Sequence, residues 1–116
     1  MDGATGYHAG LAAEDCVARH YEASGHRLRA RRWRGRGGEI DLILEDAAGL
    51  VFVEVKKSRN FEQALARFTD RQMRRICEAA CEYVAGEPAQ MDTPMRFDLA
   101  LVDGHGQTQV VENILH

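Results

Sequence analysis

Three acidic residues of this sequence stand where the surrounding pattern predicts a buried surface. Glu14 lies in the middle of a helical stripe that contains Val17 and Tyr21, and Asp41 and Glu54 lie inside strongly apolar stretches. A carboxylate on a buried face is costly unless a cation or a hydrogen-bond donor satisfies it. These acids therefore indicate a functional site. The alternatives are acids that are partly exposed, or satisfied by an arginine, on a face of ordinary salt bridges.

The stretches 39–45 and 50–56 predict two strands joined by a hairpin turn at 46–49. With a four-residue loop, the two residue numbers of each cross-strand pair add up to 95. This register places Asp41 opposite Glu54 and Glu39 opposite Lys56. Cross-strand neighbours lie about 4.5–5.5 Å apart, so two facing carboxylates repel each other unless a cation lies between them. A magnesium ion takes oxygen ligands and commonly binds one or two carboxylates with waters and phosphate.

Period-two alternation decides which side chains of the hairpin share a face. In the first strand it groups Glu39, Asp41 and Ile43 on one face, and Ile40, Leu42 and Leu44 on the other. In the second strand Glu54 and Lys56 share a face with Phe52. Phosphodiester hydrolysis needs a metal that lowers the pKa of a water and positive charge where negative charge develops. Two acids and a lysine on adjacent strands, with a third acid from a helix, supply those parts.

The elements that would position these residues follow from periodicity and capping signals. We expect a helix near 10–24 that stops at Gly25, a strand at 27–34, the hairpin, a helix or loop at 60–68, a capped helix after Thr69, and strands at 95–102 and 108–115. This pattern predicts an α/β fold, a mixed sheet flanked by helices in the order α-β-β-β-α-β-β, within a single domain over residues 1–116.

Length and composition exclude several classes of protein. The 116 residues are 45% hydrophobic and 28% charged, which is ordinary for a soluble globular domain. The three cysteines lack the spacing of a zinc site and exclude a disulfide scaffold. No apolar run is long enough to cross a bilayer, and Met1 is not followed by a secretory leader, so we expect a cytoplasmic protein without membrane association.

Basic residues are unevenly distributed in a chain whose net charge is −3. One cluster lies between Arg27 and Arg36, a second surrounds Lys57, and a third lies between Arg67 and Arg75. Such a polarised surface can hold a phosphate backbone, or it can be a solvated face. We assign the nucleic-acid contacts to Arg31, Arg32, Arg34, Arg36, Lys57 and Arg59. Trp33 could stack on a base, although burial in the sheet is the favoured interpretation.

The two hairpin strands, residues 38–43 and 51–56, resemble the YraN-like family of uncharacterised bacterial proteins. That family is similar to the PD-(D/E)xK nucleases, and especially to small Holliday-junction resolvases with a restriction-endonuclease-like fold. The likeness extends to residues 13–15 in the first helix and to Arg96, Phe97 and Asp98, where Arg96 and Asp98 are expected to form a structural pair. It covers the chain from about residue 9 to 103.

The resemblance implies a metal site for Mg²⁺ or Mn²⁺ and a DNA substrate. Asp41 and Glu54 would be metal ligands, Lys56 the catalytic lysine, and Glu14 the acid from the helix that completes the site. The backbone carbonyl of Val55 would be a further ligand. Cleavage of a junction in mirrored positions favours a homodimer.

Auxiliary roles and departures from the family pattern concern four positions. Glu39 is assigned as a partner of Lys56. Gln72 either reaches the scissile phosphate or serves only in a capping box with Thr69. Ala13 stands where the family usually has Gly, Ser58 where it has Arg, and Gln72 where Lys is common.

Three functions follow from these observations. The first is a metal-dependent endonuclease that acts on structured or branched DNA. The second is a nucleic-acid-binding module that keeps the fold and has lost most of its turnover. The third is an interaction protein with no nucleic-acid role, in which the hairpin face is simply solvated.

Overall fold

The computed structural model describes the backbone of residues 3–115 and the side chains of residues 12–115. In chain order the elements are α1 (Gly3–Ala23), β1 (Arg27–Arg34), β2 (Glu39–Asp46), β3 (Gly49–Lys57), α2 (Phe61–Ala66), α3 (Asp70–Val84), the 3₁₀ turn η1 (Gln90–Asp92), β4 (Met95–Val102) and β5 (Thr108–Val111). No helix in the described part of the chain is both long enough and apolar enough to cross a membrane.

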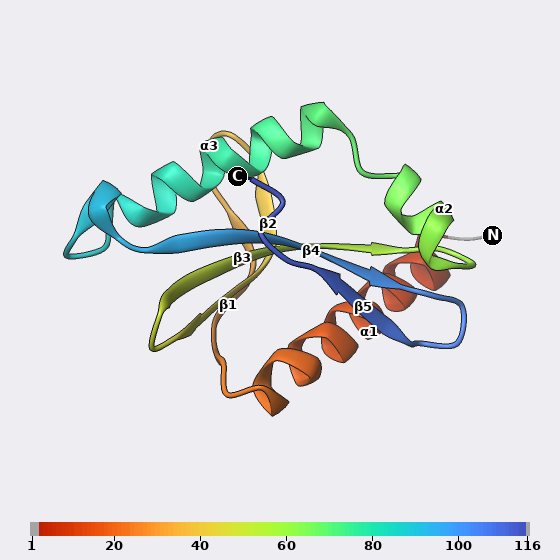
Figure 1. Ribbon diagram of the computed structural model, residues 1–116. Coiled ribbons are helices and arrows are strands. Elements are labelled where there is room, and N and C mark those ends of the chain that lie inside the picture. The colour runs from red at the N-terminus through yellow and green to blue at the C-terminus, as the bar shows by residue number, and fades with distance from the viewer. Residues whose placement is uncertain (1–2, 116) are drawn as a thin grey trace.

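The strands form one sheet in the order β1-β2-β3-β4-β5, in which β3 and β4 are parallel and the other neighbours are antiparallel. Helix α1 covers one face, and α2 and α3 lie across the other, where they form the crossover from β3 to β4 (Figure 1). The predicted α/β fold, a mixed sheet flanked by helices, is therefore confirmed. The stretch at 60–68, predicted as a helix or a loop, contains the short helix α2.

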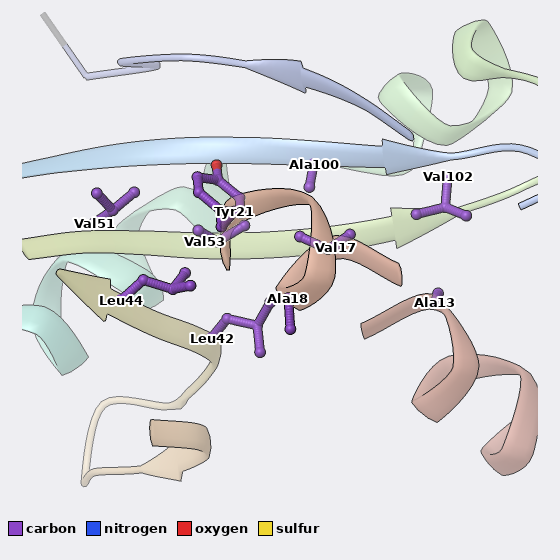
Figure 2. Close-up of a cluster of buried hydrophobic side chains, with 10 residues drawn as sticks. All are labelled: Ala13, Val17, Ala18, Tyr21, Leu42, Leu44, Val51, Val53, Ala100 and Val102. Carbon is purple, nitrogen blue, oxygen red and sulfur yellow. The ribbon is translucent and has the colours of Figure 1, made fainter. Parts of the chain in front are cut away.

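Separate hydrophobic cores fill the two faces of the sheet. Against α1 the core consists of Ala13, Val17, Ala18 and Tyr21 with Leu42, Leu44, Val51, Val53, Ala100 and Val102 (Figure 2). On the opposite face Ile40, Ile43, Leu50 and Phe52 pack against Ala79, Ala80 and Val84 of α3, and Ala64 of α2 packs on Leu99 and Leu101. Burial on both faces explains why β3 is an almost unbroken apolar run, interrupted only where the acid and lysine occur.

Local signals set most of the element boundaries. Thr69 caps α3, and the Thr69–Gln72 capping box is present in full. Gly25 follows α1 with a φ of +90°, a left-handed conformation that favours glycine. The hairpin turn is tighter than predicted, because Asp46 already pairs with Gly49 and only two residues lie between them.

The last strand is shorter than the predicted 108–115 and ends at Val111. Asn113 adopts a φ of +54°, and its backbone N–H donates to Oδ1 of Asp98 at 3.0 Å. Asp98 is 1% exposed and also accepts from the Tyr21 hydroxyl at 2.7 Å and from Nε of Arg96 at 3.1 Å. The predicted Arg96–Asp98 pair is confirmed, and the buried carboxylate draws the chain out of the sheet after β5.

Trp33 is half-buried in the sheet rather than projecting freely. It packs on the α3 face, with its ring edge-on to Tyr83 at a centroid distance of 5.3 Å. This position agrees with the favoured interpretation of Trp33 as a packing residue.

Candidate metal centre

The predicted hairpin register is confirmed along the regular part of the ladder. Leu42 pairs with Val53, and the pairing continues to Asp46 and Gly49 with the predicted sum of residue numbers. The last pair of the ladder is Leu42 with Val53, so Asp41, the neighbour of Leu42, lies just beyond it. There Oδ2 of the Asp41 side chain accepts the backbone N–H of Val55 at 2.8 Å. The Asp41 carboxylate thus replaces a backbone acceptor at the end of the β2–β3 ladder.

This replacement changes the faces of the first residues in β2. Ile40 packs with Ile43 on the α3 face, whereas strict alternation placed it with Leu42 and Leu44. The prediction for Ile40 is therefore wrong. Alternation holds only while a strand keeps its regular ladder, and here the ladder ends at Leu42.

Asp41 and Glu54 form a carboxyl pair at the end of the ladder. The Glu54 side chain is only 12% exposed. Burial raises the pKa of Glu54 to about 9, and a hydrogen bond with Asp41 and the charge of Asp41 add to this effect, while Lys56 opposes it. The raised pKa favours the protonated form of Glu54 at neutral pH, and in that form its O–H can donate a hydrogen bond to Asp41.

Lys56 lies beside this pair. Its Nζ is 3.6 Å from Oε2 of Glu54, and its side chain is 17% exposed. An ammonium held this close to Glu54 and still in reach of water can place positive charge next to a bound anion.

Glu14 faces the sheet from α1, as its place in the helical stripe predicts. It is 5% exposed, and its Oε1 accepts Nε of Arg32 at 3.0 Å. Burial raises the pKa of Glu14, the Arg32 bond lowers it, and the charges of Asp41 and Glu39 raise it further. The predicted burial of Glu14 is confirmed, and its arginine partner is the one that the alternative interpretation, an ordinary salt bridge, requires. Leu11, which helical spacing places on the same stripe as Val17 and Tyr21, lies outside the described side chains.

Arg32 reaches Glu14 from an unusual backbone conformation. Its φ is +48°, in the left-handed region that non-glycine residues rarely adopt, although it lies within β1. Sequence patterning did not reveal this contact, because it depends on α1 packing across the sheet. Strained backbone of this kind occurs often at functional sites.

Two auxiliary residues have partners that the structure identifies. Glu39 lies 3.3 Å from Nη2 of Arg34, so the expected Glu39–Lys56 pair is wrong. The cross-strand pairing that would have brought them together ends before it reaches Glu39. The Gln72 carboxamide accepts the Thr69 N–H at 3.0 Å, which makes it the capping partner of the helix.

The residues assigned to nucleic-acid contact divide into two groups. Arg31 bonds Asp15, and Arg32 and Arg34 bond Glu14 and Glu39. Within the described side chains, none of the other three makes a side-chain ion pair. These three are Arg36, Lys57 and Arg59.

The donor set decides how well a divalent cation fits. Among the described residues no three His, Cys, Asp or Glu side chains converge on one metal position. Two carboxyls do meet, Asp41 and Glu54, and Glu14 is directed to Arg32 instead. Two carboxylates suit Mg²⁺, which binds through one or two of them and keeps several waters. The pair therefore fits a magnesium-type site whose other ligands come from water or substrate.

Comparison with known proteins matches the sequence to a family. The family model described as uncharacterised protein family UPF0102 matches residues 13–102, a range that contains Glu14, Asp41, Glu54 and Lys56. A UPF0102 protein of Cereibacter sphaeroides is 52% identical over 113 residues, which are 97% of this chain and 97% of that protein. A UPF0102 protein of Roseobacter denitrificans is also 52% identical over 113 residues, with 97% and 88% covered. A UPF0102 protein of Ruegeria pomeroyi is 55% identical over 105 residues, with 90% and 85% covered.

Proposed function

The chain belongs to the uncharacterised protein family UPF0102, and we propose that it is a metal-dependent endonuclease that hydrolyses phosphodiester bonds in structured or branched DNA. One observation carries the proposal. Two carboxyls from adjacent strands, Asp41 and Glu54, meet at the end of a ladder, and a lysine ammonium lies 3.6 Å from one of them. The resemblance of this hairpin to PD-(D/E)xK nucleases and resolvases supports the assignment of substrate.

In this proposal Asp41 and Glu54, with the backbone carbonyl of Val55, hold Mg²⁺ or Mn²⁺. The ion, when bound, polarises the phosphoryl oxygen and lowers the pKa of a water. Lys56 stabilises the negative charge that develops on the attacked phosphate. Glu14, whose pKa is raised in part by the charge of Asp41, is the acid that α1 contributes near the pair.

A catalytically weak nucleic-acid-binding module is the second candidate. It is favoured by Gln72, because its carboxamide is engaged in the cap of α3 rather than directed at a substrate. Ser58, which stands where the family usually has an arginine, also removes a cation near the site. Such a module binds DNA with a steep salt dependence and produces no metal-dependent product.

The test pairs metal binding with cleavage. Manganese is titrated calorimetrically into the wild type, D41N, E54Q and K56Q, and a four-way DNA junction is then incubated with each protein and Mn²⁺. We expect D41N and E54Q to lose metal binding, and K56Q to bind metal and cleave about 10²–10³-fold more slowly. E45Q is the matched control, since Glu45 is an acid of the same strand that bonds Arg27 and Arg29.

Two results would contradict the proposal. A wild type that binds no Mn²⁺ leaves Asp41 and Glu54 as an ordinary carboxyl pair. Metal binding without any cleaved product moves the assignment to the binding module. A homodimer, which mirrored cuts in a junction would favour, is tested by sedimentation of the wild type with and without the junction.

A further inference from the structure

We infer that the basic face at the start of α3, formed by Arg71, Arg74 and Arg75, is the surface that holds the phosphate backbone of the nucleic acid. The inference rests on the proposed function for its ligand. It assigns the contact to residues other than the β1 arginines singled out by the sequence.

The arginines of β1 are largely neutralised within the fold. Arg31 bonds Asp15, and Arg34 bonds Glu39 at 3.3 Å. Arg32 is directed at the buried Glu14, and Arg29 bonds both Glu45 and Glu87. A phosphate that approached β1 would have to compete with carboxylates already in place. This cluster therefore offers little net attraction.

The α3 arginines are in the opposite situation. Arg71, Arg74 and Arg75 are all exposed, and within the described part of the chain none lies within ion-pair distance of a carboxylate. Arg71 and Arg75 are one turn apart, and Arg74 lies next to them on the helix surface. Together they present three positive charges on one short face.

After Asp70 in the first turn, the order of charges along α3 is the reverse of the order that a helix dipole favours. A helix dipole favours acids near the N-terminus and bases near the C-terminus. Here the three arginines occupy the first half, and Glu78 and Glu82 follow them. Glu82 accepts the backbone N–H of Arg36 at 2.9 Å and so holds the β1–β2 loop. The basic half remains available for an anion from outside.

The basic face also lies near the carboxyl pair. A Cβ added to Gly38 would lie 3.3 Å from Cβ of Arg75, so Arg75 sits against the residue that leads into β2 three positions before Asp41. On the far side, Nη1 of Arg67, just before α3, donates to the carbonyl of Lys57 at the end of β3 at 2.8 Å. The start of α3 is therefore tied to both strands that carry the carboxyl pair.

The basic face of α3 and the side chains of Glu54 and Lys56 lie on the same side of the sheet. The β3–β4 ladder is regular through this part of β3 and pairs Glu54 with Leu99 and Lys56 with Leu101. Leu99 and Leu101 pack with Ala64 of α2, so Glu54 and Lys56 lie on the face that α2 and α3 cover. Figure 1 shows α2 and α3 on this face and α1 on the other. A phosphate backbone that follows the arginines of α3 is thereby led to the end of the sheet where Asp41 and Glu54 meet.

The test compares two double variants that change the net charge equally. R71Q/R75Q removes two charges from α3, and R31Q/R34Q removes two from β1, so that the net charge goes from −3 to −5 in both. Binding of a fluorescent four-way junction is followed by anisotropy in EDTA, where no cleavage occurs, at several salt concentrations. Thermal melts by circular dichroism verify that both variants are folded.

We expect R71Q/R75Q to lower the slope of log K against log salt by about 2, or about one per lost phosphate contact, and to weaken binding about tenfold or more. R31Q/R34Q should leave the slope within about 0.5 of the wild type. Equal losses in the two variants would mean that only net charge matters, and an unaffected R71Q/R75Q would overturn the inference. So would a wild type that binds no junction at low salt.

The failure of the proposed function gives a different result. If the protein binds the junction through α3 and never cleaves it, with or without Mn²⁺, the inference about α3 stands and the proposed nuclease activity is wrong. D41N and E54Q should also bind the junction in EDTA at least as tightly as the wild type, because each removes an ionisable acid from the site.

Discussion

Replacing Glu54 with Gln should change the way in which the stability of the fold depends on pH. The pKa of Glu54 is raised to about 9 from its ordinary value of 4.5, so the folded chain binds this proton more tightly than the unfolded chain. A raised pKa contributes stability that is complete below about pH 4.5 and is lost as pH rises towards 9. Gln keeps a donor for Asp41 and cannot ionise, so E54Q should lose none of this stability.

The size of this change in stability follows from the pKa shift of Glu54. A difference of four to five pKa units at about 1.4 kcal/mol each sets an upper limit of about 6 kcal/mol. The Glu54 side chain is still 12% exposed, and water and the neighbouring Lys56 can rearrange around the ionised form. We therefore expect the wild type to lose about 3 kcal/mol relative to E54Q between pH 5 and pH 9.

The assay is urea unfolding of the wild type, E54Q and the control E45Q at pH 5, 7 and 9 in EDTA. The unfolding free energies of the wild type and E54Q should diverge as pH rises, with E54Q the more stable protein at pH 9. A difference that stays constant over this range would refute the reasoning, because Glu54 would then not hold a proton in the folded state. A divergence of the same size for E45Q would assign the effect to general charge repulsion.

Three further predictions concern the neighbouring groups. Binding of Mn²⁺ at pH 7.5 should release about one proton per ion, because the Glu54 proton must leave before the carboxylate binds the ion. Calorimetry in two buffers of different ionisation enthalpy measures the number of protons released. Binding without proton release would contradict the assigned protonation of Glu54. R32A should destabilise the fold by about 2 kcal/mol in urea, because Glu14 loses its cation while buried, and the loss should largely vanish when E14Q is the background. Y21F should cost about 1–2 kcal/mol, because the buried carboxylate of Asp98 loses a 2.7 Å hydrogen bond. Y83F is its control, and equal melting temperatures for the two would contradict this role.

Much of the candidate site could be predicted from the sequence because its determinants are local. Turn residues and alternating side chains set the register of β2 and β3, which brings Asp41 and Glu54 to the same end of adjacent strands. The capping box at Thr69 and the Arg96–Asp98 pair depend on spacings of three and two residues within one element. The apolar stretches at 39–45 and 50–56 predicted the two strands that carry the acids.

What the sequence could not determine depends on contacts between distant elements. Asp41 displaces the backbone from the ladder and turns Ile40 to the other face, an outcome of competition between a side-chain and a main-chain acceptor. Arg32 and Arg31 look like free cations in the sequence, and they are neutralised only because α1 brings Glu14 and Asp15 against β1. Composition and periodicity describe each element separately, whereas charge pairing depends on where helices dock. The tertiary structure alone therefore decided which arginines of the described chain are paired with carboxylates.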